Sequence, residues 1–524
     1  MTSAGDWLRR ITIVVTACLL AGAALGPIDA GGAAQEELPL GPPGLEEKRV
    51  ATRLAPGVMH TVIERGHRSS DDFFTVDVVL LRARTRAEEV AHRLRKLGHE
   101  ARVEVIAKAA PDDPRRGPIG YLVRVGRFSA EESAVRAAED LVAAGFDDSA
   151  PTYTGFDGGL TTGPWVVNVL DIDLHRFTGE IVPELGTHVV PGLETLTSIA
   201  ARTDALAAVN GGYFVIEPID GTPGDLAGIS VLGGQLISEA VNGRTSLLLR
   251  EKIGTHASIA ALRTRLSARV SGGRQWLVDG LNRKPGLIRS CGGVGGDVPT
   301  QRPKHDITCS DSGEVVVFTP AFGAQTEEGP GAEAVLDRDG RVIALREDRG
   351  SSIPPGGSVL AATGEEALQL QRRLQIGEHV VLRQRLRANG SGVRLTGLDV
   401  VNGGPGLLRG GRTRITAFGE GFVHLDDPFF YVAFGLRRNP RTIAGVTADG
   451  HLLLVTIDGR QPDWSVGASF IEEARVMRSL GALESVNLDG GGSTTLTIGE
   501  ELANRPSDEE GERPIGDALL LLNR

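Results

Sequence analysis

Near the C-terminus, an aspartate precedes three glycines and three hydroxyl side chains, an arrangement that could bind and cleave an anionic substrate. The run is Asn487-Leu488-Asp489-Gly490-Gly491-Gly492-Ser493-Thr494-Thr495. Consecutive glycines cost conformational entropy and add no side-chain packing, so their presence indicates a ligand that approaches the backbone closely. Backbone N–H groups and hydroxyls in such a loop can donate to an anion, while Asp489 supplies a carboxylate.

Two upstream segments follow the same pattern of an apolar strand that ends in asparagine and two glycines. One reads Asn210-Gly211-Gly212-Tyr213-Phe214, and the other reads Asn402-Gly403-Gly404-Pro405-Gly406. Each alone is typical of a hairpin turn, because Asn-Gly and Asp-Gly are strong hairpin signals. Three such loops in one chain favour a shared pocket instead.

Arginines accompany carboxylates at the ends of other predicted strands. Arg441 precedes the strand 443–446, Asp458 and Arg460 follow the strand 452–457, and Arg513 precedes the final strand 518–522. The planar guanidinium donates two parallel hydrogen bonds to a phosphate or carboxylate. These residues therefore predict an anion-binding hydrolytic cleft, with surface ion pairing as the alternative for any one of them.

The N-terminus has the features of an export signal. Arg9-Arg10 precede an apolar run at 11–25, and small residues follow near residue 30, so we expect residues 1–30 to be a signal peptide. An uncleaved anchor and lipidation at Cys18 are the alternatives. The mature chain contains no predicted membrane span, and we expect it to be secreted and located outside the cytoplasm.

Charge and cysteine usage narrow the class of protein further. The 524 residues carry a net charge of −11, which argues against nucleic acid as a partner. Outside the signal, Cys291 and Cys309 are the remaining cysteines, and in an oxidising compartment we expect them to form a structural disulfide. Two cysteines make a poor zinc site, so no metal site is predicted from them.

The remaining chain divides into a linker region and two predicted domains, giving an α+β protein. Residues 31–69 are predicted to hold a flexible linker (31–45) and then a first strand at 55–63. Residues 70–157 have two strand–helix–strand halves, with helices at 85–97 and, capped by Ser129, in the second half. Residues 158–524 are predicted to be mixed α+β, with helices at 193–203 and 470–480 and a β-rich elaboration at 255–400. Because a strand precedes it, the smaller domain is predicted to be inserted into the edge of the larger one.

The unit at 70–157 resembles the SPOR (sporulation-related) domain, a ferredoxin-like module. The resemblance is carried by Tyr121-Leu122-Val123-Arg124-Val125-Gly126-Arg127-Phe128-Ser129 and the Ala/Glu-rich helix after it; the first half departs from the pattern at Leu80-Leu81-Arg82-Ala83-Arg84. The resemblance implies binding of peptidoglycan glycan strands and association with the cell wall. The alternative is an inert ferredoxin-like spacer.

Six ordered motifs in the larger domain together resemble the phosphodiester glycosidase family. In addition to the three glycine loops they are Arg438-Asn439-Pro440-Arg441-Thr442, Asp458-Gly459-Arg460-Gln461 and Asn504-Arg505-Pro506-Ser507-Asp508. The resemblance implies hydrolysis of the bond between a sugar's anomeric carbon and a phosphodiester. One departure is Asp517, in Arg513-Pro514-Ile515-Gly516-Asp517-Ala518, where the family usually has asparagine.

This resemblance implies roles for the residues singled out above. Asp489 is the first candidate for the catalytic carboxylate that faces an oxocarbenium-like sugar, and Asp458 is the second candidate. The expected substrate-binding residues are Asn210, Gly211, Gly212, Tyr213, Asn402, Gly403, Gly404, Arg441, Arg460, Asn487, Gly490, Gly491, Ser493, Thr494 and Arg513. No cofactor is expected, although a divalent cation at the two aspartates stays an open alternative.

The sequence thus predicts an exported enzyme that cleaves a sugar–phosphate diester in an envelope glycopolymer. Two alternatives stay open: a non-catalytic glycan-binding protein of the envelope, and an ordinary glycosidase acting on glycan without phosphate.

Overall fold

The computed structural model describes residues 37–523 except 242, 253, 271–272, 290, 292–294, 300–307 and 425. The predicted signal peptide at 1–30 and the start of the predicted linker lie outside the described residues. Leu38–Arg524 form one compact unit. Its α-helices are α1 (Arg84–Lys96), α2 (Glu131–Ala143), α3 (Leu196–Thr203), α4 (Gly364–Arg373), α5 (Pro428–Tyr431) and α6 (Phe470–Ser479).

The segment predicted to be a flexible linker is structured from residue 38 onward, so that prediction is wrong there. Leu38 and Leu40 are buried. Arg65, itself buried, donates to the carbonyl oxygens of Leu40 (2.8 Å) and Pro42 (3.1 Å) and forms an ion pair with Glu47. The Pro/Gly composition suggested flexibility, but a buried guanidinium needs acceptors, and this segment provides them.

An antiparallel sheet of eight strands forms the frame of the larger domain. Its order is β1 (Glu47–Ala55), β2 (Val58–Arg65), β7 (Trp165–Asp173), β29 (His451–Ile457), β28 (Arg441–Thr447), β30 (Ala482–Asn487), β26 (Gly406–Arg409) and β27 (Arg412–Thr413). Because β2 pairs with β7, residues 70–157 lie in sequence between two neighbouring strands of this sheet. The predicted first strand at 55–63 is present as β2.

A second, five-stranded sheet carries the first glycine loop. Its order is β32 (Glu501–Leu502), β31 (Leu496–Ile498), β9 (Ala205–Asn210), β33 (Asp517–Leu522) and β8 (Glu180–Leu185). Leu170, Leu454 and Val486 of the first sheet share one apolar core with Val209 and Leu519 of this one. The common core fixes the ends of β9 and β30 relative to each other.

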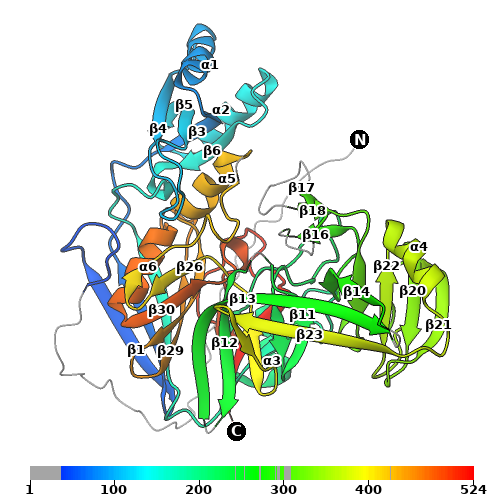
Figure 1. Ribbon diagram of the computed structural model, residues 1–524. Coiled ribbons are helices and arrows are strands. Elements are labelled where there is room, and N and C mark those ends of the chain that lie inside the picture. The colour runs from blue at the N-terminus through cyan, green and yellow to red at the C-terminus, as the bar shows by residue number, and fades with distance from the viewer. Residues whose placement is uncertain are drawn as a thin grey trace, which may run out of the picture. The chain divides into compact units, whose positions relative to one another are not determined.

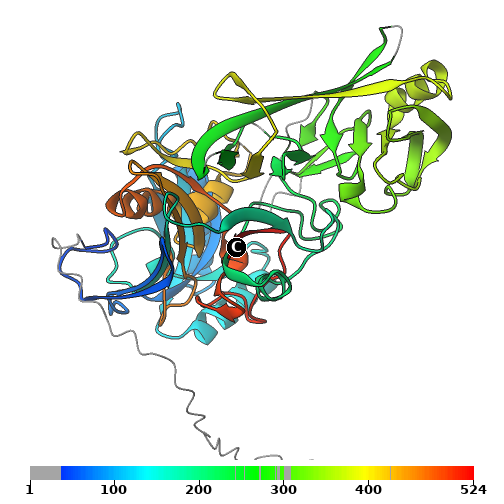
Figure 2. The same cartoon turned by 90° about the horizontal axis from the view of Figure 1, so that it is seen from below.

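The predicted β-rich elaboration is confirmed. A long sheet has the order β11 (Gln235–Ser238), β10 (Ser230–Leu232), β25 (Leu398–Val401), β12 (Thr245–Lys252), β13 (Gly254–Val270), β23 (Val380–Ala388) and β24 (Ser391–Val393), and β14 (Gln275–Val278) also pairs with β13. Figure 2 shows the paired strands β13 and β23 running out from the body of the domain. The outer sheet beside α4 has the order β15 (Gly280–Leu281), β19 (Val315–Phe318), β22 (Ser358–Ala362), β20 (Gly329–Leu336) and β21 (Val342–Arg349).

A three-stranded sheet carries the cystine. Its order is β16 (Leu287–Arg289), β18 (Thr308–Ser310) and β17 (Val298–Pro299). Cys309 in β18 is bonded to Cys291, which confirms the predicted disulfide.

The smaller domain has the two strand–helix–strand halves that the sequence predicts. Its sheet order is β4 (Ala101–Ile106), β5 (Gly120–Phe128), β3 (Phe74–Leu81) and β6 (Ala150–Tyr153), with α1 and α2 packed on it. Figure 1 shows it as the blue-to-cyan unit beside α5. The predicted cap at Ser129 is wrong: α2 begins after Ala130, without a side-chain cap, and Glu131 and Glu132 occupy its first turn.

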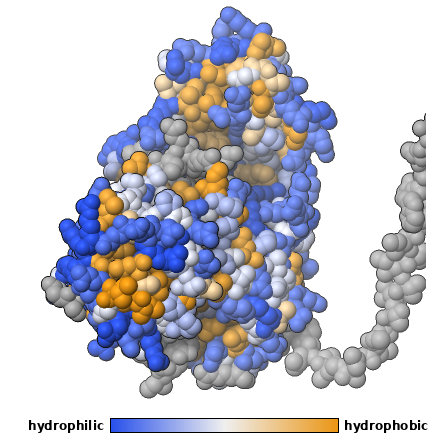
Figure 3. Space-filling view, turned by 90° about the vertical axis from the view of Figure 1, so that its right-hand side faces the viewer, coloured by the Kyte–Doolittle hydropathy of each residue, from blue (hydrophilic) through white to orange (hydrophobic). Residues whose placement is uncertain are grey.

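Polar side chains dominate the face of the molecule drawn in Figure 3, where apolar patches are separate from one another. Large apolar side chains with substantial exposure include Leu97, Val105 and Val142 of the smaller domain. No helix in the described part of the chain is long and apolar enough to span a membrane.

Candidate active site

The three glycine loops meet, as the sequence predicts. The backbone N–H of Asp489 donates to the carbonyl oxygen of Gly211 (3.2 Å), and that of Gly404 donates to Asn487 (2.8 Å). The N–H of Tyr213 donates to the side-chain oxygen of Asn402 (2.8 Å). Loops that follow β9, β25 and β30 are therefore joined directly to one another, although they are far apart in the sequence.

Asn210 connects four segments around the site. Its amide nitrogen donates to the carbonyl oxygens of Asp489 (2.8 Å) and Gly211 (3.3 Å). Its oxygen accepts from the Thr442 hydroxyl (2.6 Å) and the Thr495 N–H (3.1 Å). The side chain is fully buried and bonded at both ends, so its geometry supports positioning of the Asp489 loop, whereas the predicted contact with a sugar stays untested.

Tyr213, Asn402 and Asn487 form a buried polar cluster beneath the second loop. The Tyr213 hydroxyl donates to the Gly404 carbonyl (2.6 Å) and accepts from the Asn487 amide (2.6 Å). Burial raises the pKa of Tyr213 well above its ordinary value, so the hydroxyl keeps its proton. A side chain on Gly212 would meet Asn402 at 2.4 Å, which explains the need for glycine there.

Asp489 stands at the mouth of the triple-glycine loop and is half-buried. One carboxylate oxygen accepts from the Gly490 N–H (2.9 Å), which orients the side chain. A Cβ on Gly492 would lie 2.3 Å from both Arg513 and Asp508. The hydroxyls of Ser493 and Thr494 are buried and have no hydrogen-bond partner among the described residues. Unpaired buried donors of this kind are uncommon and are compatible with a site that a ligand completes.

Asp458 occupies a different environment from Asp489. It is fully buried, and its carboxylate accepts from Trp464 Nε1 (2.7 Å), the Asn504 amide (3.0 Å) and the Arg505 N–H (3.1 Å). Burial raises its pKa, and these three donors oppose the rise. The carboxylate therefore holds two loops together in this geometry, and its predicted catalytic role stays untested.

Arg441 and Arg513 are engaged with carboxylates. Arg441 is buried, donates to the Ala468 carbonyl (2.8 Å) and lies 2.9 Å from a carboxylate oxygen of Glu473. Burial raises the pKa of Glu473 to about 8. Arg513 forms an ion pair with Asp508 (2.7 Å) beside Gly492. Sequence reasoning did not identify Glu473 as a site residue. It stands next to Glu472 in an amphipathic helix, and nothing in the sequence indicates that it is buried against an arginine.

Arg460 is the arginine best placed for an anion. It donates to the side-chain oxygen of Asn439 (3.0 Å), and its guanidinium lies 3.2 Å from where a Cβ on Gly491 would stand. Desolvation, together with the positive charges of Arg441 and Arg513, lowers its pKa. Three arginines thus concentrate positive charge beside the loop that carries Asp489, and a negatively charged substrate would relieve their repulsion.

Asp517, at the departure from the family motif, lies directly behind the first glycine loop. It is fully buried, and one of its oxygens accepts from the Gly212 N–H (2.9 Å). Burial, together with the negative charge of Asp489, raises the pKa of Asp517 to about 7, while the hydrogen bond from Gly212 opposes the rise. Asp489 therefore lies close enough to Asp517 to influence its protonation.

The described residues contain no cluster of three or more His, Cys, Asp or Glu side chains arranged to hold a metal ion. Asp458 already accepts three protein hydrogen bonds, and the alternative of a divalent cation at Asp458 and Asp489 stays untested.

Two family models match parts of the chain. Residues 330–522 match the phosphodiester glycosidase family model, and residues 70–152 match the SPOR domain model. No curated protein matches the chain.

The solved structures that are similar to this chain include the following three. A Burkholderia pseudomallei protein named as an exported protein is 34% identical with a TM-score of 0.85, over 93% of this chain and 98% of that one. A hypothetical protein from Synechocystis is 17% identical with a TM-score of 0.54, over 92% and 80% of the two chains. The catalytic domain of zebrafish N-acetylglucosamine-1-phosphodiester alpha-N-acetylglucosaminidase is 14% identical with a TM-score of 0.32, over 81% and 84%.

Proposed function

Because this chain belongs to the phosphodiester glycosidase family and carries a SPOR domain, we propose that it hydrolyses a sugar-1-phosphodiester bond in an envelope glycan. The SPOR domain supports binding to peptidoglycan. Together with the Burkholderia pseudomallei relative that is named as an exported protein, it also supports a location outside the cytoplasm, at the cell wall.

One observation carries the proposal: Asp489 and the triple-glycine loop stand beside a concentration of arginines. The carboxylate is oriented by the Gly490 N–H, and the Arg460 guanidinium lies over Gly491. The bond to be broken joins a sugar carbon to a phosphate, so a carboxylate and a cation are needed a few ångströms apart. The triple-glycine loop provides the carboxylate, and Arg460, which follows β29, provides the cation beside it.

Each group has a role in the proposed reaction. Arg460 holds the phosphate, and the buried hydroxyls of Ser493 and Thr494 are available as further donors. Asp489 faces the anomeric carbon, either as the nucleophile or as the base that activates water. The departing phosphate is weakly basic, so no strong general acid is required. Arg441, which is paired with Glu473, contributes to the local positive charge and does not contact the phosphate.

The test is hydrolysis of a nitrophenyl phosphodiester of N-acetylglucosamine 1-phosphate by the purified protein. We expect sugar release by the wild type and a fall of about a thousandfold or more in kcat for Asp489→Asn. Asp449→Asn, an exposed carboxylate in the turn between β28 and β29, is the matched control and should release sugar at the wild-type rate. An EDTA-treated sample tests the alternative of a bound cation.

The same assay separates the competing functions. Equal rates for the wild type and Asp489→Asn would refute the catalytic assignment. Binding of stripped wall glycan without any sugar release would favour the non-catalytic glycan-binding protein. Cleavage that persists when the phosphate is removed from the substrate would favour an ordinary glycosidase.

A further inference from the structure

A pocket of about 390 Å³ lies between the SPOR domain and the glycosidase domain. The SPOR side of its wall includes Thr152, Tyr153 and Phe156, and the glycosidase side includes Phe434, Asn439 and Arg460. The volume is in the range of ordinary ligand pockets. Tyr153 is buried behind this wall, whereas Phe156 and Phe434 are partly exposed. Exposed aromatic rings beside a few polar groups suit a carbohydrate, whose rings present apolar C–H faces and hydroxyl edges.

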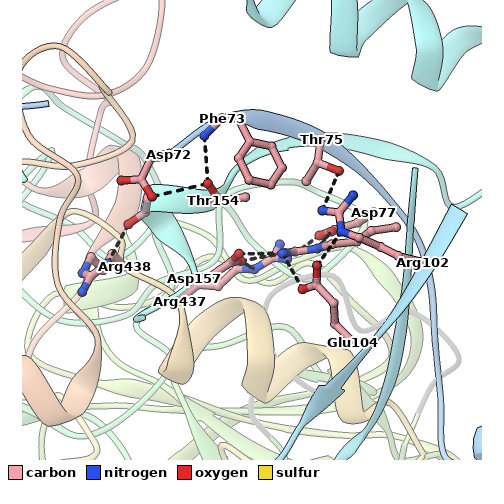
Figure 4. Close-up of polar contacts among 12 residues, drawn as sticks. Asp72, Phe73, Thr75, Asp77, Arg102, Glu104, Thr154, Asp157, Arg437 and Arg438 are labelled. Atoms are coloured by element: carbon pink, nitrogen blue, oxygen red, sulfur yellow. Dashed lines mark hydrogen bonds and ion pairs between the residues drawn. The ribbon is translucent and has the colours of Figure 1, made fainter. Parts of the chain in front are cut away.

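The two walls of this pocket are held together by buried ion pairs. Figure 4 shows Arg437 of the glycosidase domain beside Asp77 and Asp157. Asp157 also binds Arg124 (2.6 Å), which in turn binds Asp77 (2.7 Å). Next to them, Arg438 donates to the Gly155 carbonyl (2.7 Å). Because these groups are largely buried and mutually paired, the SPOR domain is fixed in place as one wall of the pocket.

These ion pairs also occupy the SPOR sheet face that lies opposite its helices. Val76 and Val78 of β3 belong to the apolar core, whereas Thr75 and Asp77 alternate with them and belong to the other face. On that face Arg102 donates to Thr75 (3.1 Å), and Arg437 from the glycosidase domain meets Asp77. A glycan that contacts the SPOR domain in this arrangement must therefore use another surface, and the pocket adjoins the edge strand β6.

Arg460 connects this pocket to the catalytic loop. Of the three arginines that line the pocket, Arg437 pairs with Asp77, and Arg438 pairs with Glu472 (2.6 Å). Within the described part of the chain, Arg460 has only the neutral Asn439 as its hydrogen-bond partner. Its charge is therefore available at the boundary between the pocket and Gly491, two residues after Asp489.

We propose that this pocket binds the carbohydrate chain that lies beyond the scissile phosphate, so that the SPOR domain forms part of the substrate cleft. The inference rests on the proposed function and extends it. Arg460 marks the position of the phosphate, the sugar to be released lies towards Asp489, and the remaining glycan lies between the aromatic walls. The substrate is accordingly a phosphate-bearing glycan polymer, and a free sugar phosphodiester fills only part of the cleft.

The experiment fills the pocket from each wall separately. Thr152→Trp adds bulk from β6, and Pro462→Trp adds it from the glycosidase side; both positions line the pocket and are partly exposed. Leu160→Trp is the matched control, because Leu160 is 94% exposed and lies outside the lining. Binding of cell-wall glycan strands, freed of stem peptides, is measured by isothermal titration calorimetry on the full chain, and thermal unfolding verifies that each variant is folded.

We expect the dissociation constant to rise about tenfold in both pocket variants and to stay unchanged in Leu160→Trp. Wild-type affinity in both folded pocket variants, or no binding by the wild type, would overturn the inference. The nitrophenyl substrate reports separately on the proposed function. If the wild type hydrolyses this substrate and the pocket variants bind strands with unaltered affinity, only the pocket assignment is refuted. If the pocket variants lose strand binding but the wild type hydrolyses nothing, the proposed enzymatic function is refuted and the pocket is left as a glycan-binding site.

Discussion

A buried aspartate behind the first glycine loop makes the stability of this protein depend on pH. Asp517 has no exposed surface, and its pKa is raised from the ordinary 3.8 to about 7, chiefly by burial. The folded protein therefore keeps a proton that the unfolded chain has already lost between these two values. Because the folded state binds more protons, the free energy of unfolding falls as pH rises through this window.

The size of the effect follows from the pKa difference. Each pH unit in the window corresponds to about 1.4 kcal/mol, so the full cost above pH 7 is about 4 kcal/mol. Asparagine at this position cannot ionise and removes this contribution to the pH dependence. Asp517 Oδ2 has no hydrogen-bond partner among the described residues, so the amide nitrogen of asparagine would lack one as well. The resulting loss of folding stability is the same at every pH.

The assay is chemical unfolding of wild type and Asp517→Asn at pH values from about 5 to about 8. We expect the wild type to lose about 3 kcal/mol relative to the variant across this range. Asp147→Asn, an exposed carboxylate in the turn after α2, is the control and should follow the wild-type pH dependence. A constant difference between wild type and Asp517→Asn at all pH values would refute the reasoning.

Three further perturbations test other parts of the site. Arg460→Gln removes the cation beside Gly491 and should raise KM for the phosphodiester about tenfold, whereas Arg475→Gln on the exposed side of α6 should not; a change in kcat alone would contradict the binding role. Gly492→Ala forces apart the Arg513–Asp508 pair and should destabilise the protein by about 1–3 kcal/mol, measured against Gly392→Ala, which meets open space. Replacement of Cys291 and Cys309 by serine opens a cross-link of sequence separation 18 and should cost about 3 kcal/mol in unfolding experiments; an unchanged midpoint would show that the cystine adds nothing.

The order of the motifs was enough to predict which loops would meet. Each of the three glycine loops follows an apolar strand, and strands in a common core bring their ends together. The two halves of the SPOR domain, the helices near 196–203 and 470–479, and the cystine were likewise predictable, because periodicity, turn residues and cysteine count act locally.

Side-chain roles within the site were less predictable. Asn210 looked like a ligand for sugar hydroxyls, yet its amide joins Asp489, Thr442 and Thr495. The sequence favours Asp489 over Asp458 only by its place before the glycines, and it suggests the same role for Arg441 and Arg460. In the structure Asp458 accepts hydrogen bonds from three donors, and Arg441 faces Glu473. Residue type and spacing cannot distinguish these cases, since both members of each pair follow or precede a strand.

The candidate groups, and the family to which their order belongs, can thus be read from the chain alone. Which of these groups are already paired within the protein, and which are available to a substrate, emerges from the fold, because burial and hydrogen-bond pairing depend on contacts between distant segments. Arg437 meets Asp77 across 360 residues of sequence, and burial behind the first glycine loop raises the pKa of Asp517. Neither effect has a local signal in the chain.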